Sequence, residues 1–162
     1  GPGGAGSRSA RGRAGARPRG WTCGRGVGAR GRAASHWGVG EDTGRPGYRY
    51  VENWGRAGDA GVLALEGRHA YGAAWYRLFS KGEPGFGFVD EQTPELTIAV
   101  VPSRRGKGAG KELLEALLAH AREEGYPAVS LSAAKAQTPY YEQFGFETVG
   151  ESEHAVTMLA RL

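Results

Sequence analysis

The stretch that decides the fold is Val100-Val101-Pro102-Ser103-Arg104-Arg105-Gly106-Lys107-Gly108-Ala109-Gly110-Lys111, which joins a predicted strand to a predicted helix. The strand at 95–101 is almost entirely apolar, and Pro102 ends it because proline cannot donate to a strand ladder. Residues 108–124 then show the apolar spacing of a helix. Glycines let a ligand approach the backbone closely, and the first N–H groups of a helix attract anions. The stretch therefore predicts a cradle for a phosphate or pyrophosphate.

The spacing of the glycines excludes two common phosphate-binding loops. A P-loop needs Gly-Lys followed by Ser or Thr, whereas Gly110-Lys111 is followed by glutamate. A dinucleotide-binding Gly-x-Gly-x-x-Gly pattern that begins at Gly106 would need a third glycine at Lys111. The pattern that remains is Arg-x-x-Gly-x-Gly, formed by Arg105, Gly108 and Gly110.

A second segment further along the chain reads Tyr141-Glu142-Gln143-Phe144-Gly145-Phe146. In this order, Val-x-Pro at 100–102, Arg-x-x-Gly-x-Gly and Tyr-Glu-x-x-Gly-Phe resemble the GNAT family of acetyl-CoA-dependent N-acetyltransferases, over about residues 50–162. The resemblance implies a GNAT-like acyl-CoA N-acyltransferase fold of the α/β class, in its α+β form with a mixed sheet. It also implies that two parallel strands, at 95–101 and 128–132, separate at the cofactor site.

The resemblance places acetyl-CoA, as co-substrate, in this cradle. Backbone N–H groups of residues 105–110 would hold its pyrophosphate, and an N–H near Val100 or Val101 would polarise the thioester carbonyl. The expected cofactor-binding residues are Val100, Val101, Arg104, Arg105, Gly106, Lys107, Gly108, Ala109 and Gly110.

Two side chains are expected to act in acetyl transfer to a primary amine, by direct attack in a ternary complex. Tyr141 matches the family's general acid for the departing thiolate, and Tyr140 is the alternative. A free tyrosine, with a pKa near ~10, is a weaker acid than a thiol near ~8.5, so Tyr141 could also only hydrogen-bond the thiolate. Glu95 is the candidate base that deprotonates the substrate ammonium, with Asp90 and Glu91 as rivals. The histidines show no metal-like spacing, so no metal is expected.

Charge divides the chain into two parts. Residues 1–50 contain ten arginines and only two acidic residues, whereas residues 51–162 contain eleven basic and fifteen acidic residues. Residues 1–46 show no sustained helical or strand period and are predicted to be a disordered Gly/Arg-rich leader. Residues 47–162 are predicted to be the GNAT domain. The leader is interpreted either as an arm that binds nucleic acid or as an unselected upstream extension.

The front of the domain departs from the family pattern. The family normally has a first strand and two helices before the hairpin, and here only a helix near 48–54 is recognisable. The first strand and first helix are therefore expected to be missing, and an open sheet edge would favour a homodimer. The remaining expected elements are strands at 61–65, 69–80, 128–132, 147–150 and 155–159, an extended piece at 86–89, and a short helix from Thr138 to Gly145.

The chain has one cysteine, Cys23, so an internal disulfide is excluded. It shows no apolar run of the ~18 residues that span a bilayer and no signal-peptide core, so a cytoplasmic location is expected. Three functions remain open: an N-acetyltransferase, a catalytically impaired acyl-CoA-binding module, and a nucleic-acid-binding protein acting through its leader. The acidic body argues against nucleic acid as the domain's own ligand.

Overall fold

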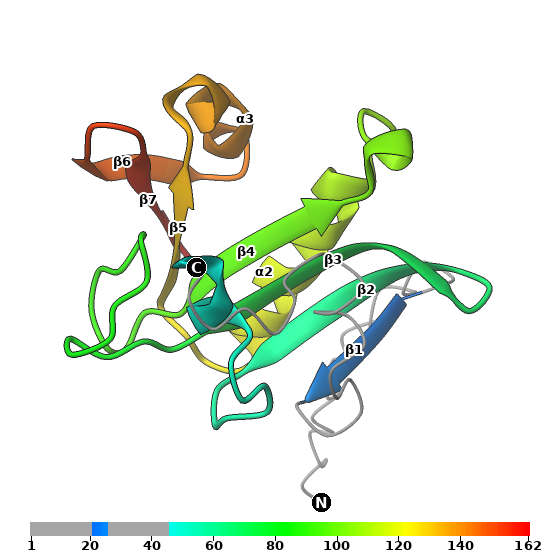
Figure 1. Ribbon diagram of the computed structural model, residues 1–162, viewed down its shortest axis with the longest axis horizontal. Helices are drawn as coiled ribbons and strands as arrows, with labels where there is room; N and C mark the ends of the chain where they lie inside the picture. The colour runs from blue at the N-terminus through cyan, green and yellow to red at the C-terminus, as the bar shows by residue number, and fades with distance from the viewer. Residues whose placement is uncertain (1–20, 26–45) are drawn as a thin grey trace, which may run out of the picture.

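The computed structural model describes residues 21–25 and 46–162, which build one mixed sheet with helices on its faces (Figure 1). The sheet has the strand order β1-β2-β3-β4-β5-β7-β6. Its strands are β1 (Trp21–Arg25), β2 (Ala60–Glu66), β3 (His69–Arg77), β4 (Glu95–Val100), β5 (Ala128–Ala133), β6 (Phe146–Glu151) and β7 (Val156–Arg161). The helices are α2 (Ala109–Glu123) and α3 (Thr138–Glu142), with short 3-10 helices η1 (Pro46–Tyr50), η2 (Pro102–Arg104) and η3 (Lys135–Gln137).

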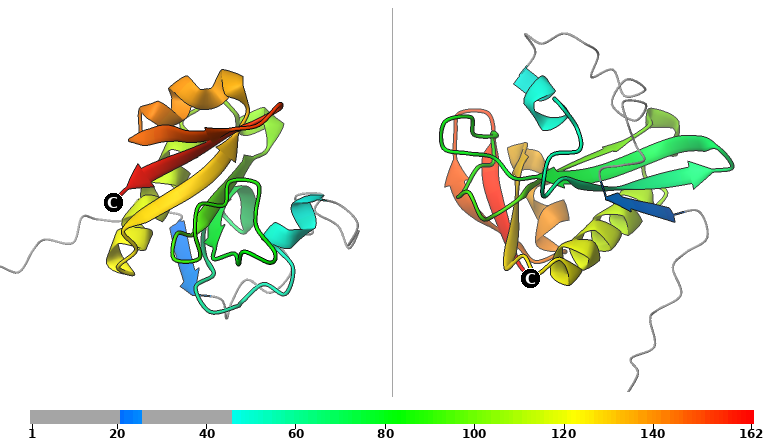
Figure 2. Two further views of the ribbon diagram at one scale, coloured as in Figure 1. Left: turned by 90° about the vertical axis from the view of Figure 1, so that its left-hand side faces the viewer. Right: turned by 90° about the horizontal axis from the view of Figure 1, so that it is seen from below.

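Helix α2 covers one face of the sheet, and η1 lies on the opposite face (Figure 2). Leu113, Leu114, Leu117 and Leu118 of α2 are buried against alternate residues of β2, β3, β4 and β5. Each buried leucine contributes about 1.5–3 kcal/mol of hydrophobic stabilisation. This face therefore holds the main hydrophobic core.

Strands β4 and β5 run parallel but separate along their length. In the described residues, their ladder pairs only Glu95 with Ser130, and the Ser130 N–H donates to the carbonyl of Pro94 at 3.0 Å. Beyond Glu95, β4 continues to pair with β3 as far as Val100, while β5 diverges from it (Figure 1). The splay that the resemblance implied is confirmed, and its vertex lies at Glu95.

Several elements differ from the sequence predictions. Strand β1 lies in the segment expected to be leader, where it pairs antiparallel with β2 before the β2–β3 hairpin, so a strand is present where none was expected. The rest of the predicted leader up to residue 45, with its nucleic-acid-binding arm, lies outside the described residues. The helix expected near 48–54 is a 3-10 turn that ends at Tyr50. A turn at Phe86 and Gly87, followed by irregular backbone, stands where an extended piece was expected at 86–89.

The boundary between leader and domain stays a prediction. Within the described part of the chain, no helix is both long enough and apolar enough to cross a membrane.

Candidate functional site

The predicted cradle lies between the end of β4 and the first turn of α2. Gly106 and Gly108 have φ angles of 76° and 85°, in the left-handed region that side chains other than glycine rarely adopt. Gly108 is the N-cap residue of α2, and a Cβ added at either glycine would meet no atom within 4 Å. The backbone at these positions therefore faces open space, as a phosphate-binding turn requires.

The two valines named for the thioester differ in what their N–H groups do. The Val101 N–H donates to the carbonyl of Tyr71 at 2.9 Å, so it points toward β3. Successive N–H groups of a strand point to opposite sides, so the Val100 N–H points toward the splay. The Val100 carbonyl accepts a hydrogen bond of 3.0 Å from Arg105 Nε, which is consistent with this orientation. Val100 is thus the better placed of the two to act on a carbonyl between β4 and β5.

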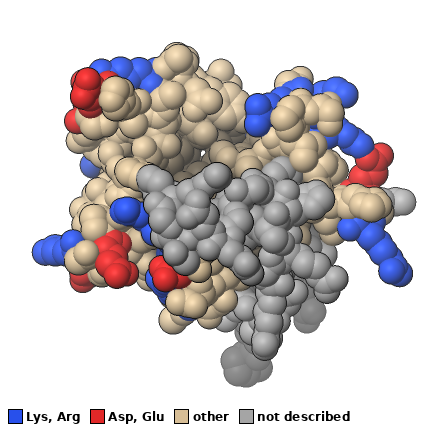
Figure 3. All heavy atoms as spheres, in the orientation of Figure 1, with Lys and Arg blue, Asp and Glu red and all other residues tan. Residues whose placement is uncertain are grey.

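Basic side chains surround this turn (Figure 3). Arg104 pairs with Glu66, and its guanidinium carbon lies 4.9 Å from the ring centroid of Tyr71, so its side chain packs against the β2–β3 hairpin. Arg105 is held at the end of β4 and Lys107 is exposed. The cradle therefore combines backbone donors with positive charge, a combination that suits an anionic ligand.

Glu95 lies at the vertex of the splay, on the face opposite α2, and only 2% of it is exposed. Its Oε2 accepts a hydrogen bond from the Tyr50 hydroxyl, and its Oε1 accepts one of 2.9 Å from the Gly87 N–H. Burial raises the pKa of Glu95, although both hydrogen bonds and the charge of Arg49 lower it in part. A carboxylate whose pKa is raised in this way is suited to accept a proton near neutral pH.

Tyr50 was not singled out by the sequence analysis, and it is central to this arrangement. Its hydroxyl also accepts the Phe86 N–H at 2.8 Å, while its carbonyl accepts the indole N–H of Trp75 at 3.1 Å. Burial, followed by the nearby charge of Glu95, raises the pKa of Tyr50. No local pattern marks Tyr50, because its contact with Glu95 spans 45 residues.

A buried ion pair fixes the segment that carries Tyr50. Arg77 of β3 donates to both oxygens of Asp59, at 2.9 and 2.7 Å, and each side chain is 1% exposed. Arg77 Nη1 also donates to the carbonyls of Arg49 and Glu52, at 3.0 and 2.6 Å. The guanidinium therefore ties β3 to the residues on both sides of Tyr50.

The two tyrosines of α3 occupy different environments. Tyr141 is 9% exposed and packs edge-on against Phe146, with ring centroids 6.0 Å apart, and its burial raises its pKa. Tyr140 is 38% exposed, and its hydroxyl lies 3.0 Å from the position that a Cβ on Gly110 would occupy. Burial, with a contribution from Glu115, raises the pKa of Tyr140. Tyr140 therefore faces the first turn of α2, whereas the ring of Tyr141 packs into the core.

The rival bases have local roles in the loop before β4. Asp90 Oδ1 accepts the Gln92 N–H at 2.9 Å, and Glu91 Oε1 accepts the Lys81 N–H at 3.1 Å. Neither is held at the splay as Glu95 is.

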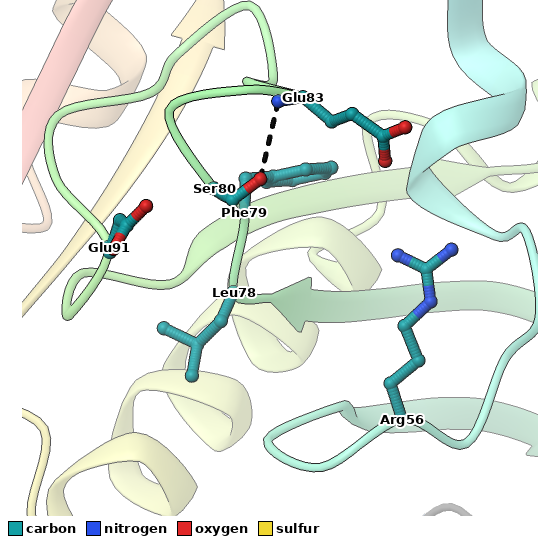
Figure 4. Close-up of a pocket in the computed structure, with 6 residues that line it drawn as sticks. All are labelled: Arg56, Leu78, Phe79, Ser80, Glu83 and Glu91. Carbon is teal, nitrogen blue, oxygen red and sulfur yellow. Dashed lines mark hydrogen bonds between the residues drawn. The ribbon is translucent and has the colours of Figure 1, made fainter.

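Glu91 also lines a pocket of about 280 Å³ that lies past the end of β3 (Figure 4). The pocket is lined by Arg56, Leu78, Phe79, Ser80, Glu83 and Glu91. Since β3 and β4 are antiparallel, it lies at the opposite end of β4 from the cradle. Phe79 connects it to the site, because the Phe79 ring packs edge-on against Tyr50 with centroids 5.2 Å apart. Among the described residues, no group of three or more His, Cys, Asp or Glu could hold a metal ion.

Comparison with known proteins agrees with this geometry. The sequence matches the Acetyltransferase (GNAT) family over residues 34–146. The search of curated protein sequences found no match. Among solved structures, ribosomal-protein-alanine N-acetyltransferase from Brucella melitensis is 26% identical, with a TM-score of 0.55 over 71% of this chain and 76% of its own.

Two further structures share the fold. ElaA from Escherichia coli is 17% identical, with a TM-score of 0.64 over 86% of this chain and 97% of its own. PaiA N-acetyltransferase from Thermoplasma acidophilum, solved in complex with coenzyme A, is 15% identical, with a TM-score of 0.52 over 64% of this chain and 61% of its own. With the family match covering more than half of its length, this chain belongs to the GNAT acetyltransferase family.

Proposed function

We propose that this protein is an acetyl-CoA-dependent N-acetyltransferase that acetylates a primary amine by direct attack in a ternary complex. The observation that carries the proposal is the splay of β4 and β5, which opens beyond Glu95 toward the glycine turn at 106–108. A thioester arm fits between separated strands, and its pyrophosphate fits a helix N-terminus with open glycine backbone. The coenzyme A bound to the Thermoplasma relative supports the same ligand here.

The residues of this chain divide the chemistry among them. Backbone N–H groups from Gly106 to Gly110 hold the pyrophosphate, because the Arg105 N–H already donates to the Pro102 carbonyl at 3.3 Å. Arg105 and Lys107 supply positive charge, and Arg104 adds to it from its pair with Glu66. The Val100 N–H donates to the thioester oxygen as negative charge develops on it. Glu95 takes the proton that the substrate ammonium must lose, and the freed amine attacks the carbonyl carbon. As the C–N bond forms and the C–S bond breaks, Tyr141 hydrogen-bonds or protonates the thiolate, with Tyr140 as the alternative.

A second candidate function is acyl-CoA binding without turnover. It is favoured by one observation, which is that Glu95 is almost completely buried and both of its oxygens already accept hydrogen bonds. The two functions share the cofactor site and differ in whether an amine is consumed.

Calorimetric titration of acetyl-CoA into the full chain tests the cofactor site. We expect micromolar binding to the native protein, and at least tenfold weaker binding to Gly108→Val, because a side chain there strains the cradle and blocks the ligand. Gly125→Val is the matched control, since Gly125 ends the same helix with a φ of 87° and equally open surroundings. Equal affinity of both variants and the native chain would remove the cradle assignment.

Turnover is measured as release of free thiol from acetyl-CoA in the presence of a panel of primary amines. The panel includes a peptide that begins with alanine, because the Brucella relative is named for acetylating a ribosomal-protein alanine. Amine-dependent thiol release supports the transferase, whereas tight binding with no release for any amine favours the second candidate.

A further inference from the structure

The carboxylate of Glu95 is closed off by the loop that precedes β4. A Cβ added at Gly85 would lie 2.3 Å from Glu95 Oε1, and one added at Gly87 would lie 2.5 Å from the backbone carbon of Leu131 on β5. The loop therefore packs closely against the Glu95 carboxylate and against the backbone of β5. With 2% of Glu95 exposed, a substrate amine has little room to reach either oxygen directly.

The Tyr50 hydroxyl is the group that lies against this carboxylate. It donates its proton to Glu95 Oε2 and accepts the Phe86 N–H at 2.8 Å. A hydroxyl has one donor and two acceptor lone pairs, so one lone pair remains for a further donor. The ring of Tyr50 also stacks at 6.3 Å on Phe86, whose side chain is exposed. Tyr50 is 9% exposed and so less deeply buried than Glu95, and it is therefore the link from Glu95 toward the surface.

We propose that Tyr50 is the proton relay between the substrate ammonium and Glu95, an inference that rests on the proposed acetyltransferase function. The ammonium donates one N–H proton to Tyr50 Oη, while the proton already on Oη moves to Glu95 Oε2. The amine becomes neutral and nucleophilic, the carboxylate becomes a carboxylic acid, and the hydroxyl of Tyr50 is unchanged. Tyr50 is thus a catalytic residue that touches the reacting amine, while Glu95 is the final proton acceptor.

The charges around the pair are compatible with this transfer. Arg49, on the same element as Tyr50, is a positive charge that lowers the pKa of Glu95 and of Tyr50. Arg77, the cross-strand neighbour of Glu95 on β3, has its charge neutralised by Asp59. Ser130, the partner of Glu95 on β5, is uncharged.

Burial outweighs these charges for both members of the pair. The pKa of Tyr50 is raised, so its hydroxyl keeps the proton that the relay passes on, and the pKa of Glu95 is raised, so it accepts one readily.

Tyr50→Phe tests the relay, because the ring contacts with Phe79 and Phe86 and the Trp75 bond to the Tyr50 carbonyl can remain. Tyr48→Phe is the matched control, since it is the same substitution on the same 3-10 helix. The first readout needs no ligand: the side-chain carboxyl ¹³C signal of Glu95 is followed by NMR as pH is raised. Loss of a hydrogen bond to the carboxylate raises its pKa, so Glu95 should titrate at higher pH in Tyr50→Phe and unchanged in Tyr48→Phe.

The second readout uses the amine that the panel identifies. We expect kcat/KM of Tyr50→Phe to fall about 10- to 100-fold at unchanged acetyl-CoA affinity. The acidic limb of its pH profile of kcat/KM should move to higher pH. Glu95 titrating in Tyr50→Phe as in the native chain, or kcat/KM within twofold of native, overturns the relay while leaving the transferase intact. A native chain that consumes no amine refutes the proposed function itself, and the relay falls with it.

Discussion

The strongest stability prediction concerns the buried pair of Arg77 and Asp59. Asp59→Ala removes the carboxylate that accepts two hydrogen bonds from Arg77 and two of 3.0 Å from the N–H groups of Gly55 and Arg56. The guanidinium then remains buried without a counter-charge. Because Arg77 also holds the carbonyl of Arg49, the variant should loosen the segment that carries the Tyr50 hydroxyl.

The size of the effect follows from burial. With both side chains 1% exposed, breaking the pair leaves an uncompensated charge, which costs about 3–5 kcal/mol. A domain of this size is stable by only about 5–15 kcal/mol, so Asp59→Ala should lose a large part of its free energy of unfolding. Removing both partners, in Asp59→Ala with Arg77→Met, leaves no buried charge. The double variant should therefore lose at least about 2 kcal/mol less than the two single variants together.

Urea denaturation followed by tryptophan fluorescence and far-ultraviolet circular dichroism measures these free energies. Glu52→Ala is the control, because Glu52 pairs with Arg56 at 3.6 Å on the surface, with side chains 41% and 40% exposed. Such a pair contributes about 0–1 kcal/mol, so little change is expected. If Asp59→Ala lost less than about 1 kcal/mol, or if the two single effects simply added, the ion pair would not hold this segment as argued.

Two further variants test the chemistry. If Tyr141 hydrogen-bonds or protonates the thiolate, Tyr141→Phe should lower kcat by about 100-fold at unchanged acetyl-CoA affinity, and Tyr140→Phe should leave kcat unchanged. The reverse result in the thiol-release assay would assign that role to Tyr140. Burial raises the pKa of Glu95, so the folded protein keeps the Glu95 carboxyl protonated at pH values above about 4.5, where the unfolded chain has lost that proton. The free energy of unfolding therefore falls as pH rises from about 4.5 through the raised pKa of the folded protein. Glu95→Gln removes this dependence, so its free energy of unfolding should rise relative to that of the native chain as pH rises above about 4.5 in urea denaturation. A difference that stays constant with pH would contradict the raised pKa.

The glycine turn at 106–108 and the helix that follows it could be predicted because they are encoded locally. The apolar run of β4, the proline after it, the spaced glycines and the leucine stripe of α2 all lie within 30 consecutive residues. Each of these signals depends on a few neighbouring residues, so it can be recognised without knowledge of the rest of the fold. The separation of β4 from β5 was predicted only through the family resemblance. The apolar pattern of β4 does not show whether its side toward β5 is paired or open.

Strand β1 and the Tyr50–Glu95 contact could not be predicted in this way. Strand β1 is five residues long, lies in a glycine- and arginine-rich segment, and owes its conformation to pairing with β2 some 35 to 43 positions away. Tyr50 lies in the segment predicted as a helix near 48–54, whereas its position at the site comes from a contact across 45 residues. Periodicity reports which side of an element is buried, but it does not report which distant polar groups meet there.

The loop before β4 shows the same limit and explains why the candidate base is placed where it is. In the sequence, Gly85 and Gly87 indicate only a loop. Each glycine is needed, because a Cβ at Gly85 would collide with the Glu95 carboxylate and one at Gly87 with the β5 backbone. Their close approach brings the Gly87 N–H onto Glu95 Oε1, at the one point where the described residues of β4 and β5 still pair. In the proposed function, Glu95, the base, is therefore held on the joined part of the sheet, and the cofactor would enter the open part. A base whose two oxygens are both fixed by hydrogen bonds is held in one position, as a proton acceptor beside a separate cofactor site requires.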